Sequence, residues 1–169
     1  MKPIHPVKRF LRHIASHPWQ VRRYFSEAAL QHIEQAIADS ERLHAGEVRV
    51  VIESGLPLSA IMRRVSPRQR AIQLFGQLNI WDTEHNNGVL IYLMLADRDV
   101  EIIADRGIHR HIGDPGWQHI CRQMEGMFRS GQFEQGVTHG IAAIGQHLAA
   151  YFPPETMPRN ELSNHVLVL

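Results

Sequence analysis

The chain has 169 residues, of which 44% are hydrophobic and 21% are charged, and its net charge is +1. This composition is typical of one globular domain and excludes a largely disordered chain. The single cysteine, Cys121, excludes an intrachain disulfide, and the longest apolar run, residues 89–96, is too short for a membrane-spanning helix of ~20 residues. Because the N-terminus also lacks the apolar run of a secretory signal, we expect a cytoplasmic protein.

The first 26 residues carry six bases and no acid. Within them, apolar residues recur at helical spacing and predict a helix over residues 7–16 with one apolar stripe and a basic back. The stripe consists of Val7, Phe10, Leu11 and Ile14. It either docks on the domain's own core or binds a membrane surface or a protein partner, which would make the protein peripheral to the membrane. We treat residues 1–25 as a basic amphipathic N-terminal segment.

The globular part, residues 26–152, begins with a helix and a strand. Ser26 is a good N-cap for a helix that ends near Gly46. Residues 47–54 alternate and are rich in β-branched side chains, so they predict a strand with one face toward the core.

A crossover helix and a hairpin follow. Ser66-Pro67 predicts the start of a helix lined by Ile72, Phe75 and Leu78. Residues 88–95 are apolar throughout, which predicts a strand covered on both faces. The turn at 96–99 and the apolar residues 100–104 predict a third strand, antiparallel to the second.

The last part of the chain is predicted to be helical with a terminal extension. A polar loop from Gly107 to residues 113–116 precedes two helices, and Cys121 lies on the apolar stripe of the first as a core thiol. We expect the tail, residues 153–169, to be a mobile extension. If its last apolar residues order, adding an edge strand to a neighbouring molecule would make a homodimer.

Acids, amides and histidines gather on two segments, residues 82–87 and 105–114. The start of the second strand lies beside the end of the third in an antiparallel hairpin, so we expect these segments to converge. The candidate metal ligands are Asp82, Asn86, Asn87, Asp105, His109 and Asp114. Oxygen donors of this kind suit calcium or magnesium, with manganese or zinc as alternatives. The alternative is that they are ordinary surface turns, where Asp, Asn and Gly are common.

A second acidic group is expected at the opposite end of the sheet. It comprises Glu53 at the end of the first strand and Asp97 and Asp99 in the hairpin turn. If the first two strands are parallel, this is their carboxyl end, where α/β sheets usually bind ligands. The alternative is a turn in which Arg98 forms local ion pairs with the two aspartates.

Several catalytic motifs are absent from the sequence. It has no phosphate-binding P-loop, no dinucleotide-binding G-x-G-x-x-G, no G-x-S-x-G and no C-x-x-C. Nucleic-acid binding is not expected, because only the basic N-terminal segment favours it.

Several segments together resemble the TPM domain family in order and spacing. They are Leu78-Asn79-Ile80-Trp81, Asn86-Asn87-Gly88-Val89-Leu90-Ile91, Asp97-Arg98-Asp99-Val100-Glu101-Ile102, Arg106-Gly107-Ile108 and residues 128–136. The resemblance covers roughly residues 26–152. It implies a three-layer α/β sandwich of helices around a small mixed β-sheet, divalent-metal binding in several members, and a reported acid phosphatase activity.

The metal-binding residues that the resemblance implies are changed here. The family's Asp-Asn-Gly before the central strand is Asn86-Asn87-Gly88, and its Gly-Tyr-Gly-Leu-Glu stretch reads as residues 105–109, which lose a glutamate but gain Asp105. Asp114 matches a following acid.

Two functions follow as hypotheses. The first is a divalent-metal-binding interaction or assembly module. The alternative is a metal-dependent acid phosphatase in which Arg98 or Arg106 contacts phosphate and His109 or His111 serves as general acid or base.

Overall fold

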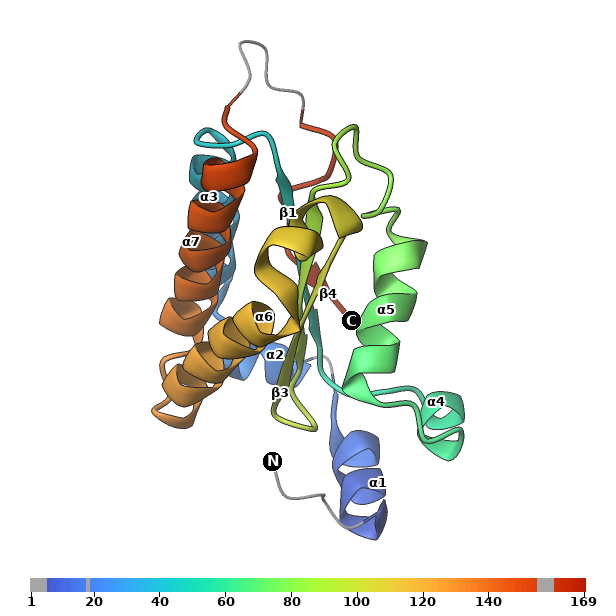
Figure 1. The fold of residues 1–169 in the computed structure, drawn as a ribbon. Coiled ribbons are helices and arrows are strands. Elements are labelled where there is room, and N and C mark those ends of the chain that lie inside the picture. Colours follow the sequence, from blue (N-terminus) through green and yellow to red (C-terminus); the bar gives the residue numbers. More distant parts are fainter. Residues whose placement is uncertain (1–5, 18, 155–159) are drawn as a thin grey trace.

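The computed structural model describes residues 6–17, 19–154 and 160–169, and a central sheet with helices on both faces dominates it (Figure 1). In chain order the elements are α1 Pro6–Ala15, α2 Trp19–Tyr24, α3 Glu27–Glu41, β1 Glu47–Glu53, α4 Leu58–Met62, α5 Pro67–Gln77, β2 Gly88–Met94, β3 Asp99–Ala104, α6 Arg106–Arg129, α7 Phe133–Tyr151 and β4 Leu167–Val168. The predicted sandwich of helices around a small mixed sheet is confirmed.

The four strands are ordered β3-β2-β1-β4. β1 runs parallel to both β2 and β4, whereas β3 runs antiparallel to β2. The predicted hairpin of β2 and β3 is therefore present. The carboxyl ends of β1 and β2 meet the hairpin turn at one end of the sheet, and the start of β2 meets the start of α6 at the other (Figure 1).

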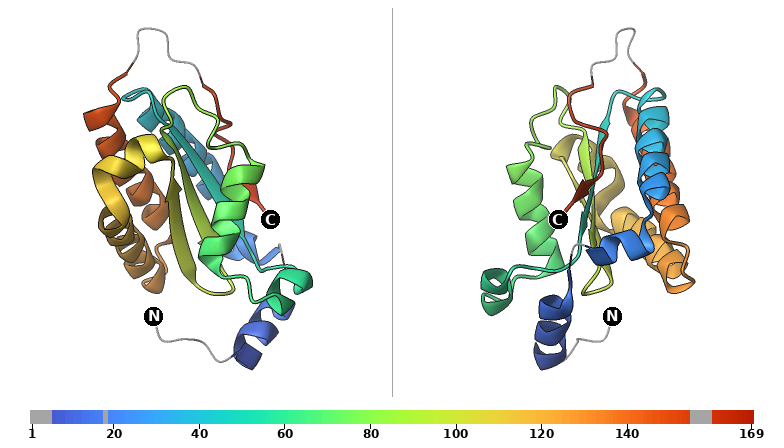
Figure 2. Two further views of the ribbon diagram at one scale, coloured as in Figure 1. Left: turned by 45° about the vertical axis from the view of Figure 1, so that its right-hand side comes forward. Right: turned by 180° about the vertical axis from the view of Figure 1, so that it is seen from behind.

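Two apolar cores fill the spaces between the layers. On one face of the sheet α3, α6 and α7 pack over Val50, Ile52 and Ile91, while on the other α5 packs over Val51 and Tyr92. The two views of Figure 2 show α5 on one side of the sheet and the α3 and α7 pair on the other.

β1 is buried on both faces, so the prediction of a single core-facing side was wrong. β4 pairs along its outer edge, and this makes β1 an inner strand. Polar and apolar residues alternate along β1 because each of its polar side chains has a specific partner. The guanidinium of half-buried Arg49 donates to the Ser163 carbonyl, and the buried carboxylates of Glu47 and Glu53 accept hydrogen bonds from other groups.

The crossover helix α5 starts as predicted, and Phe75 and Leu78 of its predicted apolar face pack against the second core, but Ile72 does not. The Ser66 side chain accepts a hydrogen bond from the Gln69 N–H in a reciprocal capping box, and Pro67 follows it. Ala71 and Leu74 are the buried residues, whereas Ile72 is 53% exposed. The short helices α2 and α4 were not predicted.

The predicted polar loop before residue 116 is wrong, because α6 begins directly after β3. Asp105 is its N-cap, and its side chain accepts a hydrogen bond from the Arg106 N–H. The helix is kinked at Gly113, whose φ of 67° and ψ of 170° are not helical. Gly107, Gly113 and Pro115 suggested a loop. Of these three residues only Gly113 leaves helical geometry, and Pro115 lies at the start of the segment after the kink, where its missing N–H costs little.

Residues 160–169 of the C-terminal tail pack on their own domain, so the prediction of a mobile extension was wrong for them. The Leu169 N–H donates to the Ile52 carbonyl, and β4 pairs with β1. The buried carboxylate of Glu47 accepts from the N–H groups of Glu161 and Leu162 at 3.0 and 3.1 Å. Pairing of this tail with a second copy of the chain stays a prediction.

The predicted N-terminal helix is present, but its apolar stripe does not dock on the core as a whole. Phe10 packs against the second core, whereas Val7, Leu11 and Ile14 are 58%, 58% and 56% exposed. The helix is held instead by a polar side that includes buried His13.

Candidate functional site

The segments at the start of β2 and the end of β3 meet, as the hairpin predicted. The Asp105 N–H donates to the Gly88 carbonyl and the Gly107 N–H donates to the Asn86 carbonyl, both at 2.9 Å. Only glycine fits at 107, because a Cβ there would lie 2.3 Å from the Asn86 carbonyl oxygen and 2.6 Å from that of His85. The first turn of α6 is therefore held directly against the loop before β2.

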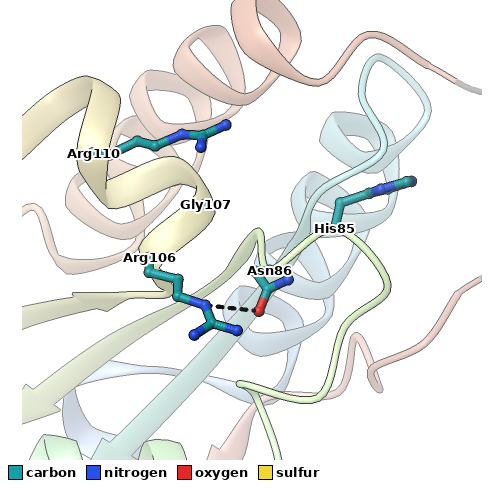
Figure 3. Close-up of a pocket in the computed structure, with 5 residues that line it drawn as sticks. All are labelled: His85, Asn86, Arg106, Gly107 and Arg110. Atoms are coloured by element: carbon teal, nitrogen blue, oxygen red, sulfur yellow. Dashed lines mark hydrogen bonds between the residues drawn. The ribbon is translucent and has the colours of Figure 1, made fainter.

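A hollow of about 460 Å³ lies at this junction and is lined by five residues (Figure 3). They are His85, Asn86, Arg106, Gly107 and Arg110. The Arg106 Nε donates to the Asn86 Oδ1 at 3.3 Å, and these two side chains point toward each other in Figure 3. The Arg110 Nε lies 3.2 Å from the His111 Nε2. Among the described residues that line the hollow, none is an acid.

The two arginines occupy positions that α6 alone does not favour. Arg106 and Arg110 are four residues apart, so they lie on one side of the helix, and such a like-charged pair costs about 0.3 kcal/mol. They also lie at the helix N-terminus, where the helix dipole favours anions over cations. An anion in the hollow would offset both effects.

The six predicted metal ligands are not brought together as one set. Asp82 lines a different hollow of about 320 Å³ together with Arg49 and Glu161. Asp114 is exposed and lies 3.5 Å from Arg68. His109 uses its Nδ1 to accept a hydrogen bond from the indole of Trp117 at 3.2 Å.

Asn86, Asn87 and Asp105 do lie at the junction. The Asn87 side-chain amide donates to the Ala45 carbonyl at 2.9 Å, which leaves its Oδ1 buried without a hydrogen-bond partner. The Asp105 Oδ2 is likewise buried without a partner, while its Oδ1 caps the helix. These two oxygens fit an oxygen-seeking cation, but no group of three histidines, cysteines or acids with metal-site geometry occurs among the described residues.

The two predicted phosphate contacts lie at opposite ends of β3. Arg106 lines the hollow, whereas Arg98 sits in the hairpin turn with a φ of 56° and is exposed. Of these two predicted contacts, only Arg106 lies at the junction. Arg110 was not predicted as part of this site, although it could have been found once residues 105–114 were treated as a helix.

Two members of the predicted second acidic group, Glu53 and Asp97, form ion pairs. Glu53 is buried and accepts from the Arg70 Nε and Nη2 at 3.0 and 2.9 Å and from the Tyr92 hydroxyl at 2.6 Å. Burial, together with the neighbouring Glu53, raises the pKa of Tyr92 far above its usual value. These groups are fully engaged with one another, which indicates a structural role.

Asp97 in the hairpin turn binds α1 and not the adjacent Arg98. It accepts from Arg9 Nε at 3.1 and 3.0 Å, and from Arg9 Nη2 at 2.9 Å, and it lies 3.1 Å from His13 Nε2. Burial alone raises the pKa of Asp97, but His13 and Arg9 outweigh it, so the net pKa is lowered. The alternative prediction, in which Arg98 forms a local ion pair with Asp97, was therefore wrong, because the partners of Asp97 are Arg9 and His13.

Cys121 packs partly buried against the core, as predicted. Burial raises the pKa of its thiol to about 12. Because the thiolate is the reactive form, this side chain is unsuited to nucleophilic chemistry.

The fold and its junction define a class of α/β sandwich with a four-stranded mixed sheet and a polar loop set against the first turn of a helix. The sequence profile of the TPM domain matches residues 21–147, and the chain belongs to the TPM domain family. No significant match was found among curated proteins.

Two solved structures share the fold. The NMR structure of the BA42 protein from the psychrophilic bacterium Bizionia argentinensis is 31% identical, with a TM-score of 0.74, covering 85% of this chain and 94% of that one. The solution NMR structure of the N-terminal domain of a protein from P. gingivalis is 21% identical, with a TM-score of 0.57, covering 90% of this chain and 96% of that one. None of the described helices has the length and apolar character needed to cross a bilayer.

Proposed function

We propose that this TPM-domain protein is an interaction module that binds an anionic group, phosphate or carboxylate, in the hollow at the start of α6. The observation that carries the proposal is the pair Arg106 and Arg110 lining one hollow at a helix N-terminus, without an acid among the described lining residues. Guanidinium groups bind phosphate and carboxylate through paired hydrogen bonds, and His85 adds a third nitrogen-bearing side chain.

Calorimetric titration with inorganic phosphate and with phenyl phosphate tests this proposal. Replacing both Arg106 and Arg110 by glutamine should weaken binding at least ten-fold, since a hydrogen bond to a charged group contributes about 1.5 to 3 kcal/mol. Arg122→Gln, an exposed arginine further along α6, is the matched control and should bind as the wild type does. Equal binding by all three proteins would contradict the proposal.

A divalent cation is the second candidate, and it is favoured by the two unpartnered buried oxygens, Asn87 Oδ1 and Asp105 Oδ2. With so few protein donors, water would complete the coordination, as it commonly does around magnesium. The positive charge of Arg106 and Arg110 opposes a cation here, and we therefore rank this candidate below the anion. If an ion binds, it would add positive charge next to the hollow and strengthen anion binding.

A thermal-shift series on chelator-stripped protein with calcium, magnesium, manganese and zinc tests the cation. An ion present at 100 times its dissociation constant adds about 2.7 kcal/mol to stability. Asp105→Ser is the informative variant, because serine keeps the N-cap and removes the second carboxylate oxygen. A shift that persists in Asp105→Ser would exclude this position as the ligand.

The acid phosphatase of the alternative hypothesis requires more than binding. The residues lining the hollow include Arg106 for a phosphate contact but no serine, threonine, cysteine or acid that could serve as a nucleophile. Release of phosphate from phenyl phosphate, dependent on an added divalent ion and lost in Asp105→Ser, would establish the enzyme. We expect binding without turnover.

A further inference from the structure

The N-terminal helix α1 is fixed to the domain by polar contacts along one side. Arg9 is bonded to Asp97 and donates from Nη2 to the Val65 carbonyl at 2.8 Å. His13 is buried, and its Nδ1 accepts from the Leu56 N–H at 2.9 Å. These long-range contacts set the rotation of the helix about its axis.

This rotation turns the apolar stripe outward. At roughly 100° per residue, Val7, Leu11 and Ile14 share one face, well away from Arg9 and His13. All three are more than half exposed. Large apolar side chains at helical spacing are normally buried, so their exposure as a group indicates a binding face.

Neighbouring elements carry further exposed apolar side chains. α4 contacts α1, and both lie at the end of the sheet that holds the hairpin turn (Figures 1 and 2). In α4, Leu58 and Met62 are one turn apart and are 55% and 71% exposed. Trp19, the first residue of α2, is 59% exposed. Tryptophan is enriched where proteins meet the membrane–water boundary.

Six exposed bases lie on or directly after these helices. Lys8 and Arg12 lie on α1, Arg22 and Arg23 on α2, and Arg63 and Arg64 directly after Met62, and all are exposed. No acid occurs in residues 1–26. Exposed apolar side chains surrounded by bases complement a surface with an apolar interior and anionic head groups.

We propose that α1, with α4 and Trp19, forms a docking face for an anionic lipid bilayer. The apolar side chains are few and sit on projecting helices, which suits insertion into a head-group layer better than the filling of a protein groove. Exposed valine, leucine and isoleucine have no role against a nucleic-acid backbone. The docking face lies at the opposite end of the sheet from the hollow, so a bound membrane would leave the hollow open to solvent.

Vesicle flotation of the full chain tests the proposal. Vesicles of phosphatidylcholine mixed with phosphatidylserine should carry the protein, and those of phosphatidylcholine alone should carry much less. Lys8→Gln with Arg12→Gln should lower the partition coefficient about five-fold for each base removed, and added salt should have the same direction of effect. Leu11→Gln should lower it about ten-fold.

Ile72→Gln is the matched control for Leu11→Gln, because Ile72 on α5 is 53% exposed and lies outside the docking face. Its binding should equal that of the wild type. Equal binding by Leu11→Gln and Ile72→Gln, or no binding to anionic vesicles, would overturn the proposal. Unfolding curves establish that the variants are folded, which is expected because every substituted side chain is exposed.

Quenching of tryptophan fluorescence by brominated lipid reports the orientation. Trp19 lies at the docking face, whereas Trp81, which is 52% exposed, lies at the other end of the sheet before β2. Quenching should be lost in Trp19→Phe and retained in Trp81→Phe. The reverse pattern would show that the protein meets lipid through the end that carries the hollow, and would refute the docking face.

Discussion

Arg9 of α1 and Asp97 of the hairpin turn form a two-pronged ion pair across 88 positions of sequence, with Arg9 Nη2 2.9 Å from Asp97 Oδ2. Asp97 is only 5% exposed in its side chain and Arg9 20%. The pair therefore links the basic N-terminal segment to the end of the sheet and is largely shielded from solvent.

Arg9→Gln is expected to lower the free energy of unfolding by about 3 kcal/mol, because it leaves a buried carboxylate without its main partner. Urea unfolding at neutral pH measures the loss. The effect should shrink in acid: the pKa of Asp97 is lowered by folding, so its contribution is present above the usual pKa of an aspartate and is lost as the pH falls through the folded value. A loss that is constant down to strong acid would contradict the role given to this pair.

Gly107→Ala is expected to be strongly destabilising, by about 2 kcal/mol or more, because the new methyl group would meet two backbone carbonyl oxygens that cannot move aside easily. It should also remove anion binding, since it displaces α6 from the loop before β2. Gly126→Ala is the control in the same helix. Nothing lies within 4 Å of a Cβ at Gly126, so this change should stabilise the helix by up to about 1 kcal/mol. Similar effects of the two substitutions would show that the close approach at Gly107 is not a constraint.

Stability should decline as the pH rises from about 4.5 to 7. Burial raises the pKa of both Glu41 and Asp99 to about 7. Over this range the unfolded chain has already released these protons while the folded protein keeps them, so raising the pH favours unfolding. Glu41→Gln should remove part of the slope and stabilise the protein by about 1 kcal/mol near pH 8, since glutamine can still accept from the Val48 N–H. A slope unchanged in Glu41→Gln, measured by urea unfolding at several pH values, would contradict this assignment.

A chain that ends at Pro154 is expected to lose about 2 to 4 kcal/mol of stability, because it loses β4 and the hydrogen bonds that Glu47 and Ile52 make to the tail. It would also expose the outer edge of β1, an unpaired strand edge that promotes association. Urea unfolding and light scattering measure the two effects. A truncated protein as stable and as monodisperse as the full chain would show that the tail is dispensable for the sheet.

Local sequence signals predicted those parts of the fold that depend on neighbouring residues. The Ser26 and Ser66 caps, the apolar run of β2 and the β2–β3 hairpin all follow from short-range chemistry. The place of β4 could not be predicted in this way, because its pairing with β1 joins residues far apart in the chain. A strand of two residues also has too little pattern to stand out.

The convergence of the two polar segments was predicted from the sequence, but the alignment of Arg106 with Arg110 was not. The hairpin alone brings Asn86 next to Asp105, and that convergence could be deduced. Treating Gly107 and Gly113 as loop residues hid the helix that aligns Arg106 with Arg110. The ionic network of Arg9, His13 and Asp97 was likewise hidden, because no sequence spacing connects residues so distant.

The most direct test of the anion-binding site is a phosphate titration followed by amide NMR on the wild type and on the variant with both Arg106 and Arg110 replaced by glutamine. We expect the signals of His85, Asn86 and Gly107 to shift with added phosphate in the wild type and to stay fixed in the variant. Signals that do not respond, or that respond equally in both proteins, would contradict anion binding in this hollow.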